Sequence, residues 1–334
     1  MHIGDDARLE DSFGRHITYL RLSVTDRCDL RCRYCMAEQM KFLPRSQILT
    51  LEELARLGQV FRGLGVTRIR VTGGEPLARS NVLTLFQALG RLSGLRDLTL
   101  TTNGTRLARF AAPLKDAGVT RINISLDSLR TDRFREITRV GDLDTVLGGI
   151  EAARKQGFRR LKLNSVILRD GNRDEIVDLA RFALERDMDI SLIEEMPLGM
   201  IGGRDRAGAY CSSDAILDDL ARAFDLVPSA ETTGGPSRYY RVNGYDGRIG
   251  LIAPHSHNFC DACNRVRVTS EGRLLLCLGQ EHSVDLRRVL RAHPLDDERV
   301  RAAVVEAVRL KPRGHEFVPG GRSSLLRHMN ATGG

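Results

Sequence analysis

Six of the seven cysteines in this chain fall into two groups of three, and each group has a spacing suited to a metal centre. They are Cys28, Cys32 and Cys35 in TDRCDLRCRYCM, and Cys260, Cys263 and Cys277 in FCDACNRVRVTSEGRLLLCL. Tetrahedral zinc normally takes four protein ligands. A four-iron cluster held by three thiolates leaves one iron without a protein ligand, and that iron can bind a small molecule. Both groups therefore point to iron–sulfur clusters with one open iron.

Zinc is the alternative for each group, and it competes more strongly at the second. No histidine lies near the first group in the sequence, whereas His255, His257 and His282 could each supply a fourth ligand to the second. Cys211 stands alone, and we expect it to be an ordinary small side chain.

The elements that must position these groups follow a regular rhythm. From about residue 17 to 196, short β-like runs alternate with amphipathic helical stretches, which is typical of βα units around a parallel sheet. The runs lie near residues 18–24, 67–72, 97–102, 120–126, 160–166 and 189–195. Two pairs have the spacing of helix capping boxes, Thr50 with Glu53 and Asn172 with Glu175. Six units are fewer than the eight of a closed barrel, so we expect an α/β fold: an incomplete (βα)6 TIM-like barrel.

The rhythm changes after Pro197. The pattern predicts a glycine-rich loop over 197–212, a short helix over 213–223, strands over 238–278 and helix over 283–308. We therefore expect two domains. Residues 1–212 form the partial barrel, and residues 213–334 form a smaller α+β region that carries the second cysteine group.

The predicted strands alternate between apolar and polar residues, so one face of the sheet is apolar and the other polar. The helices must cover the apolar face, and the barrel interior is then polar. Among the polar positions are Arg21, Arg70, Thr101 and Lys162. Enclosed cations cost free energy unless a ligand or water pairs with them, which favours an anionic ligand. An antiparallel sheet with one wet face would give the same alternation, but the helix-length connections argue against hairpins.

The composition narrows the choice of ligand. The 334 residues include 51 Lys and Arg against 43 Asp and Glu, a net charge of +8, which favours an anionic partner. Aromatic residues are only 5% of the chain and Trp is absent, so there are few platforms for stacking bases. This favours a phosphorylated small molecule over nucleic acid. The sequence shows neither an apolar run of about 18 residues nor a signal peptide, so we expect a cytoplasmic protein with no membrane partner.

The first cysteine group has the spacing C-x3-C-x2-C and resembles the radical S-adenosylmethionine (SAM) enzymes, whose open iron binds SAM. Gly73-Gly74-Glu75-Pro76, after the second predicted strand, is similar to the turn that holds the methionine end of SAM in that family. Across nearly its whole length the chain resembles the GTP 3′,8-cyclases of molybdenum cofactor biosynthesis. The stretches that carry this resemblance are LRLSVTDRCDLRCRYC, RVTGGEPL, FCDACNRVRVTSEGRLLLC and the final Gly333-Gly334.

The resemblance implies a lyase with two [4Fe-4S] clusters that uses SAM to convert GTP to (8S)-3′,8-cyclo-7,8-dihydroguanosine 5′-triphosphate. The implied iron ligands are the six grouped cysteines. The implied SAM contacts are Tyr34, Gly74, Ser125 and Met196. The implied GTP contacts are Arg21, Arg70, Thr101, Lys162, Arg265, Val266 and Arg267. The implied catalytic residues are Arg265, Arg267, Gly333 and Gly334.

The tail and the partners also follow from this resemblance. The Gly pair is expected to reach into the active site, although Thr332 stands where the family usually has an apolar residue. The expected partners are GTP, a flavodoxin- or ferredoxin-like electron donor and a downstream cyclic pyranopterin monophosphate synthase, and the family allows a homodimer. Two other functions remain open at this point: a radical SAM enzyme that modifies peptides with an auxiliary cluster, and a zinc-bearing RNA-binding protein.

Overall fold

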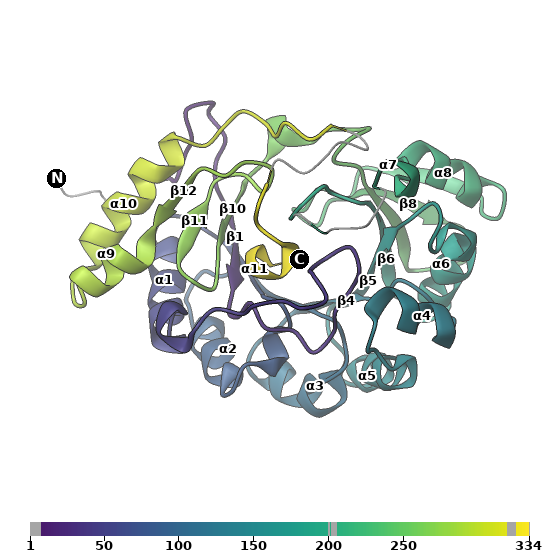
Figure 1. Cartoon of the computed structure of the whole chain (residues 1–334), viewed down its shortest axis with the longest axis horizontal. Helices are drawn as coiled ribbons and strands as arrows, with labels where there is room; N and C mark the ends of the chain where they lie inside the picture. Colours follow the sequence, from purple (N-terminus) through teal and green to yellow (C-terminus); the bar gives the residue numbers. More distant parts are fainter. Residues whose placement is uncertain (1–7, 200, 202–205, 319–324, 334) are drawn as a thin grey trace.

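The computed structural model describes residues 8–199, 201, 206–318 and 325–333. Twelve strands form a single sheet in the order β12-β11-β10-β1-β2-β3-β4-β5-β6-β9-β8-β7. In Figure 1 this sheet curves into an open ring with helices along its outside. The strands are β1 (Tyr19–Ser23), β2 (Arg68–Thr72), β3 (Asp97–Thr102), β4 (Arg121–Ser125), β5 (Arg160–Ile167), β6 (Asp189–Glu194), β7 (Leu226–Ser229), β8 (Arg238–Val242), β9 (Arg248–Ile252), β10 (Arg265–Val268), β11 (Arg273–Leu275) and β12 (Ser283–Asp285).

The helices of the barrel pack against the apolar face of the sheet. They are α1 (Leu51–Gly63), α2 (Val82–Gly90), α3 (Leu107–Asp116), α4 (Thr131–Thr138), α5 (Leu143–Lys155) and α6 (Ile176–Leu184). The remaining helices are α7 (Arg206–Ala209), α8 (Ser213–Ala221), α9 (Leu286–Ala292), α10 (Asp297–Arg309) and α11 (Met329–Thr332). In α1, for example, Leu54, Leu57 and Phe61 recur at helical spacing and are buried against the sheet.

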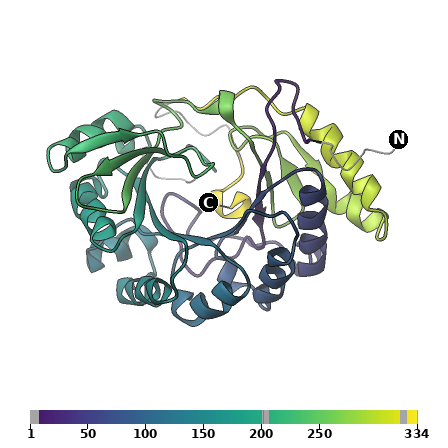
Figure 2. The ribbon, with the colours of Figure 1, turned by 180° about the vertical axis from the view of Figure 1, so that it is seen from behind.

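The prediction of a partial barrel with six βα units is confirmed for β1 to β6, and all six predicted strands lie where the pattern put them. The parallel part is nonetheless wider than expected. Strand β10 pairs in parallel with β1, and β9 pairs in parallel with β6. The C-terminal part of the chain thus adds one parallel strand to each edge of the six-stranded unit, while the ring stays open. Figure 2 shows the same arrangement from behind.

Local predictions had mixed outcomes. The Thr50–Glu53 capping box is present at the start of α1. The Asn172–Glu175 capping box is wrong, because tertiary contacts take both side chains. Asn172 accepts from the Leu168 amide at 2.8 Å and donates to the Asp127 carbonyl at 2.7 Å, whereas Glu175 accepts from the Leu129 amide at 2.8 Å.

The helix expected over 283–308 is also wrong in detail, because the segment begins with strand β12. A break at 293–296, which contains Pro294, then separates α9 from α10. The other predicted C-terminal segments contain α8 and strands β8 to β11 as expected. Within the described residues, no helix is both long and apolar enough to cross a membrane.

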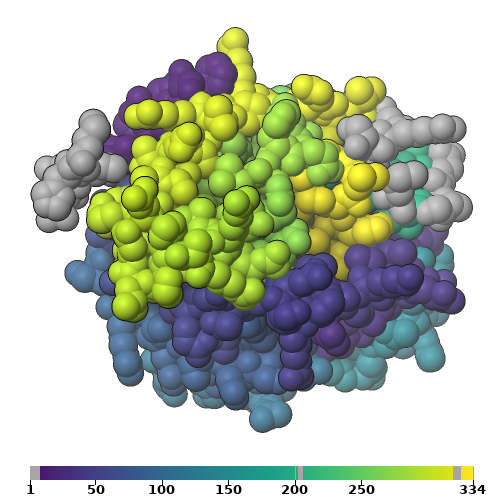
Figure 3. Space-filling model, turned by 60° about the vertical axis from the view of Figure 1, so that its left-hand side comes forward, coloured from purple at the N-terminus to yellow at the C-terminus, as the bar shows by residue number. Residues whose placement is uncertain are grey.

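The C-terminus returns to the middle of the ring, where α11 lies in both ribbon views. The Asn330 side chain donates to the Asp26 carbonyl at 2.8 Å, and the Met329 amide donates to the Cys35 carbonyl at 3.3 Å. In the space-filling view of Figure 3, the yellow C-terminal part lies directly against the dark purple N-terminal part. Helix α11 therefore packs against the loop that carries the first cysteine group.

Candidate active site

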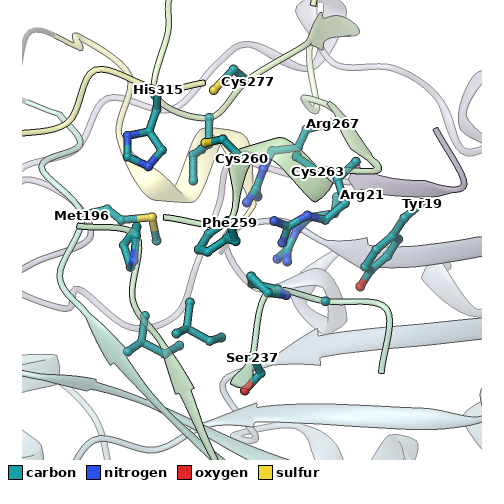
Figure 4. Close-up of a pocket in the computed structure, with 18 of the residues that line it drawn as sticks. Tyr19, Arg21, Met196, Ser237, Phe259, Cys260, Cys263, Arg267, Cys277 and His315 are labelled. Carbon is teal, nitrogen blue, oxygen red and sulfur yellow. The ribbon is translucent and has the colours of Figure 1, made fainter. Parts of the chain in front are cut away.

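The largest group of predicted site residues lines one hollow inside the ring. The predicted residues in its wall are Arg21, Arg70, Lys162, Met196, Cys260, Cys263, Arg265, Val266, Arg267 and Cys277. Thr101 accepts a hydrogen bond of 3.1 Å from Nη1 of Arg70. The second cysteine group and most of the predicted GTP contacts thus share one site, and Figure 4 shows Arg21 and Arg267 beside the three cysteines.

Four cations of this site, Arg21, Arg70, Arg265 and Arg267, come from the neighbouring strands β1, β2 and β10, and Lys162 comes from β5. Arg21 on β1 lies opposite Arg267 on one side and Arg70 on the other, while Tyr19 lies between Arg265 and Arg68. Residues two apart share a face of a strand. The six side chains therefore form a grid of five arginines and one tyrosine on one face of the sheet, and we call this the arginine grid. All but Arg68, which pairs with Asp97, line the pocket.

Burial and the crowding of like charges lower the pKa values of two arginines of the grid. Burial lowers the pKa of Arg267 to about 10, and the charge of Arg265 adds to the effect. Burial and the charge of Arg267 likewise hold the pKa of Arg21 below its usual range. Bringing positive charges together in a buried place costs free energy, and a polyanion offsets that cost. The grid is therefore suited to a triphosphate.

The second cysteine group is anchored by two basic residues that sequence reasoning missed. Arg15 donates to the Cys260 carbonyl at 2.7 Å. The ammonium of Lys311, itself buried, lies 3.6 Å from Sγ of Cys263 and donates to the Arg265 carbonyl at 3.0 Å. No local pattern marks either residue, because each reaches the group from a distant part of the chain.

Two of the three histidines considered as zinc ligands, His255 and His257, bond to other groups through Nε2. Nε2 of His255 lies 3.0 Å from the Glu195 carbonyl, and Nε2 of His257 lies 2.7 Å from Asp214. A different histidine, His315, lines the pocket beside the cysteines. It was missed because it lies 38 residues after Cys277 in the sequence.

The first cysteine group occupies the loop after β1. The amides of Arg31 and Arg33 donate to the carbonyls of Thr138 and Ile137 at 3.0 and 2.9 Å, which fixes the loop against the end of α4. The Gly73-Gly74 turn after β2 packs on the start of the same loop. A Cβ on Gly74 would overlap the carbonyl of Arg27, so only glycine permits this close approach.

Glu75, in the same turn, connects three elements. Its buried carboxylate accepts from the amides of Leu77 and Asn103 at 2.9 and 2.7 Å and from the hydroxyl of Thr102 at 2.8 Å. Asn103 in turn donates to Asp29 in the cysteine loop at 2.7 Å. Glu75 therefore fixes the turn relative to the loop that carries the first group.

Tyr34 is held by a residue that was not predicted. Its hydroxyl donates to Oδ2 of the buried Asp127 at 2.7 Å, and Oδ1 of Asp127 accepts from the Val166 amide at 2.8 Å. Asp127 follows Ser125, the last residue of β4, by two positions. A polar residue just beyond a barrel strand was the available signal.

The tail residues reach the same interior. Gly333 has a φ of 78°, and its carbonyl accepts a hydrogen bond of 2.6 Å from Arg267. Thr332 is buried, and its hydroxyl bonds to the Met329 carbonyl at 3.1 Å, which accommodates the polar residue at this position. Gly334 lies outside the described residues.

All seven cysteines carry free thiols. In the part of the chain that the structure describes, no three His, Cys, Asp or Glu side chains are grouped to ligate a single metal ion. The case for iron comes from the donors themselves. Burial, with the charge of Glu75, raises the pKa of Cys28 to about 12, and burial raises that of Cys35 to about 12. Raised pKa values of this kind oppose thiolate formation without a metal, so it is the donor set, three thiols within one loop, that fits an iron–sulfur cluster.

The second group differs in its electrostatics. Burial alone would raise the pKa of Cys263, but the charges of Arg265 and Lys311 lower it to about 7. A thiol in such surroundings forms a thiolate readily, and a thiolate is the form that binds iron. This group also fits a metal centre.

Comparison with known proteins agrees with this picture. A model of the radical SAM superfamily matches residues 22–183, and one described as Molybdenum Cofactor Synthesis C matches residues 188–317. The structure of Streptococcus suis SuiB bound to S-adenosylmethionine has a TM-score of 0.61 at 15% identity, covering 89% of this chain and 69% of that one. This likeness shows the fold. The open barrel, the cysteine loop after β1 and the family match define an enzyme of the radical SAM superfamily, which uses SAM and an iron–sulfur cluster.

Close relatives then specify the member of that superfamily. The GTP 3′,8-cyclase of Saccharophagus degradans is 57% identical over 98% of this chain and 99% of its own length. That of Pseudomonas entomophila is 58% identical over 98% of both chains. The chain belongs to the GTP 3′,8-cyclase family.

Proposed function

We propose that this chain cyclises GTP between C3′ of the ribose and C8 of guanine, the reaction for which its family is named, as a step in molybdenum cofactor biosynthesis. The observation that carries the proposal is the shared pocket. It places the second cysteine group beside the arginine grid, so a base and a triphosphate can be held in one hollow.

The proposed centre has two [4Fe-4S] clusters, one on Cys28, Cys32 and Cys35, the other on Cys260, Cys263 and Cys277. When bound, the first cluster and SAM supply the radical chemistry that starts the reaction. Tyr34, Gly74, Ser125 and Met196 are proposed to hold SAM. Of these, Met196 lies in the wall of the GTP pocket itself, so it would stand where the two substrates meet.

The chain's own task is then to orient GTP and keep water away. Arg21, Arg70, Lys162, Arg265 and Arg267, with Thr101 and the backbone of Val266, are proposed to hold the nucleotide. Planar guanidinium groups suit bidentate contacts with phosphate oxygens. Fixing the triphosphate at one end and guanine at the second cluster leaves the ribose little freedom, and such orientation accounts for a large share of rate.

Arg265, Arg267, Gly333 and Gly334 are the proposed catalytic residues. Gly333 is buried beside Arg267, which supports a tail that closes over the site rather than a frayed end. The division into residues 1–212 and 213–334 stays a prediction.

The partners proposed are a small flavodoxin- or ferredoxin-like electron donor, a downstream cyclic pyranopterin monophosphate synthase and, as an assembly, a homodimer. Six thiols that must stay reduced to hold iron also support a reducing compartment, the cytoplasm.

The proposal is tested by incubating the anaerobically reconstituted protein with SAM, a reductant and either GTP or ATP. We expect 5′-deoxyadenosine and the cyclised nucleotide with GTP only. Equal turnover of ATP, or no turnover of GTP in protein that contains iron and sulfide, would refute it.

A further inference from the structure

Two cations in the wall of the pocket are each held by the hydroxyl of a buried tyrosine. Nε of Arg70 donates to the hydroxyl of Tyr19, and Nζ of Lys162 donates to that of Tyr239 at 2.8 Å. Only 4% of Tyr19 and 2% of Tyr239 are exposed to solvent. The tyrosines come from β1 and β8, two strands that lie far apart in the order of the sheet.

Each tyrosine is itself fixed. The ring of Tyr239 lies 4.5 Å from the guanidinium of Arg248, and Arg248 is bound to the buried Asp189 at 2.7 and 3.1 Å. The hydroxyl of Tyr239 also lies 3.2 Å from that of Thr233. Tyr19 is part of the arginine grid and occupies a central strand. Neither phenol can move without disturbing a buried neighbour.

The type of partner sets these two cations apart from two other buried ones. Arg15 and Arg248 are paired with carboxylates, those of Asp11 and Asp189. A carboxylate cancels the charge of its partner, and it would repel a triphosphate. A neutral hydroxyl accepts a hydrogen bond from the Arg or Lys side chain and so fixes the direction of one N–H. It does not cancel the positive charge of that side chain, which stays available to a phosphate.

The pKa values of the two phenols agree with their role as neutral partners. Burial alone would raise the pKa of Tyr19, but the charges of Arg70 and Arg21 lower it to about 8. The phenol is therefore mostly neutral at pH 7. Burial alone would also raise the pKa of Tyr239, but the charge of Lys162 lowers it below its usual value.

We propose that Tyr19 and Tyr239 are positioning residues for GTP, which hold Arg70 and Lys162 with their charged ends toward the triphosphate before the nucleotide arrives. The inference rests on the proposed function. It deepens that function by assigning part of the specificity for phosphate to two tyrosines that act through the cations they hold. Prior fixing of the cations removes part of the entropy loss on binding.

The test measures binding of GTP and of guanosine to the reconstituted full-length protein, without SAM. Tyr19→Phe and Tyr239→Phe should each raise the dissociation constant for GTP about 3- to 10-fold, the worth of one hydrogen bond. The dissociation constant for guanosine, which has no phosphate, should change less than about twofold. Tyr240→Phe, at the neighbouring position of β8 on the opposite face, is the matched control and should bind both ligands like wild type.

A double-mutant cycle separates positioning from a structural role. If Tyr19 acts through Arg70, Tyr19→Phe should have no further effect on GTP binding in protein that already carries Arg70→Ala. Equal losses for GTP and guanosine, or independent losses in the cycle, would overturn the inference. Unchanged GTP binding in both tyrosine variants would overturn it while leaving the proposed function intact, whereas wild-type protein that does not bind GTP would overturn both.

Discussion

Nη1 of Arg267 donates a hydrogen bond of 2.6 Å to the carbonyl oxygen of Gly333. The side chain belongs to β10, between Cys263 and Cys277 of the second cysteine group, and the carbonyl belongs to the residue that follows α11. A residue proposed to bind GTP therefore also holds the tail, and the two roles are linked through one guanidinium.

The tail contact predicts a strong effect of Gly333→Ala. The residue has a φ of 78°, which disfavours alanine, and an added Cβ would overlap the side chain of Thr72. We expect the tail to leave the site, and GTP-dependent formation of 5′-deoxyadenosine to fall at least about tenfold, since misplacement at an active site is costly. Gly157→Ala is the control, because its φ of 60° gives similar strain in open space. Equal activity of the two variants would contradict the prediction.

Loss of either guanidinium of β10 should weaken GTP binding. Hydrogen bonds to charged groups are worth about 1.5–3 kcal/mol, so Arg265→Ala and Arg267→Ala should each raise the dissociation constant for GTP about 10- to 100-fold. SAM binding should be retained. Calorimetry under anaerobic conditions measures both. Arg288→Ala, which removes an exposed charge from α9, should leave both constants unchanged, and a similar loss there would point to long-range charge instead of contact.

The two cysteine groups should lose iron separately. Cys28→Ala and Cys277→Ala should each lower the iron and sulfide content of reconstituted protein by about half, because each removes one of the three ligands of a single cluster. Only Cys28→Ala should abolish SAM cleavage outright. Cys211→Ala removes a buried thiol outside both groups and should keep full iron content. Stoichiometric zinc in place of iron at Cys277 would refute the second cluster.

A stability prediction concerns the pair that supports Tyr239. Asp189→Ala would leave Arg248 with only the half-exposed Glu231, 2.6 Å from its Nη1, and losing the buried partner of such a pair costs up to about 3–5 kcal/mol. Urea unfolding measures the loss. The exposed pair of Arg181 and Asp178, 3.5 Å apart, provides the comparison, since Asp178→Ala should cost less than about 1 kcal/mol. Similar losses for the two variants would contradict this account.

The ionisation of Tyr19 should make both the stability of the protein and its affinity for GTP depend on pH. Its pKa of about 8 lies below the usual value of 10, so its ionisation stabilises the folded protein above pH 10, and this contribution is lost as the pH falls through 8. The phenolate would repel a triphosphate, so GTP affinity should fall as the pH rises above about 8. Ultraviolet titration of the free protein should show a phenol with a midpoint near 8, absent from Tyr19→Phe and shifted upward by GTP. A midpoint near 10 in wild-type protein would contradict the prediction.

Local periodicity in the sequence predicted those features of the site that depend on residues close together in the chain. Alternation along each strand placed Arg21, Arg70 and Lys162 on the interior face, and the structure puts all three in the pocket wall. The spacing of each cysteine group is likewise a local property, since the first group lies in one loop and the second spans one short pair of strands. These features need no knowledge of how distant segments pair.

Residues that reach the site from far along the chain escaped prediction. Tyr239, Lys311 and Asp127 act through contacts with Lys162, Cys263 and Tyr34, and those contacts depend on the packing of the whole ring. The Asn172–Glu175 pair failed for the same reason, because its local pattern was overridden by partners elsewhere. A single sequence does not show which strand lies beside β1 or β6.

The placement of β9 and β10 has a consequence for synthesis of the protein. Until residues 248–268 leave the ribosome, the unit of β1 to β6 has both outer strands without their parallel neighbours. Exposed strand edges invite pairing with other chains. The nascent protein should therefore depend on chaperones most between emergence of β6 and emergence of β10, and truncations that end in this interval should aggregate.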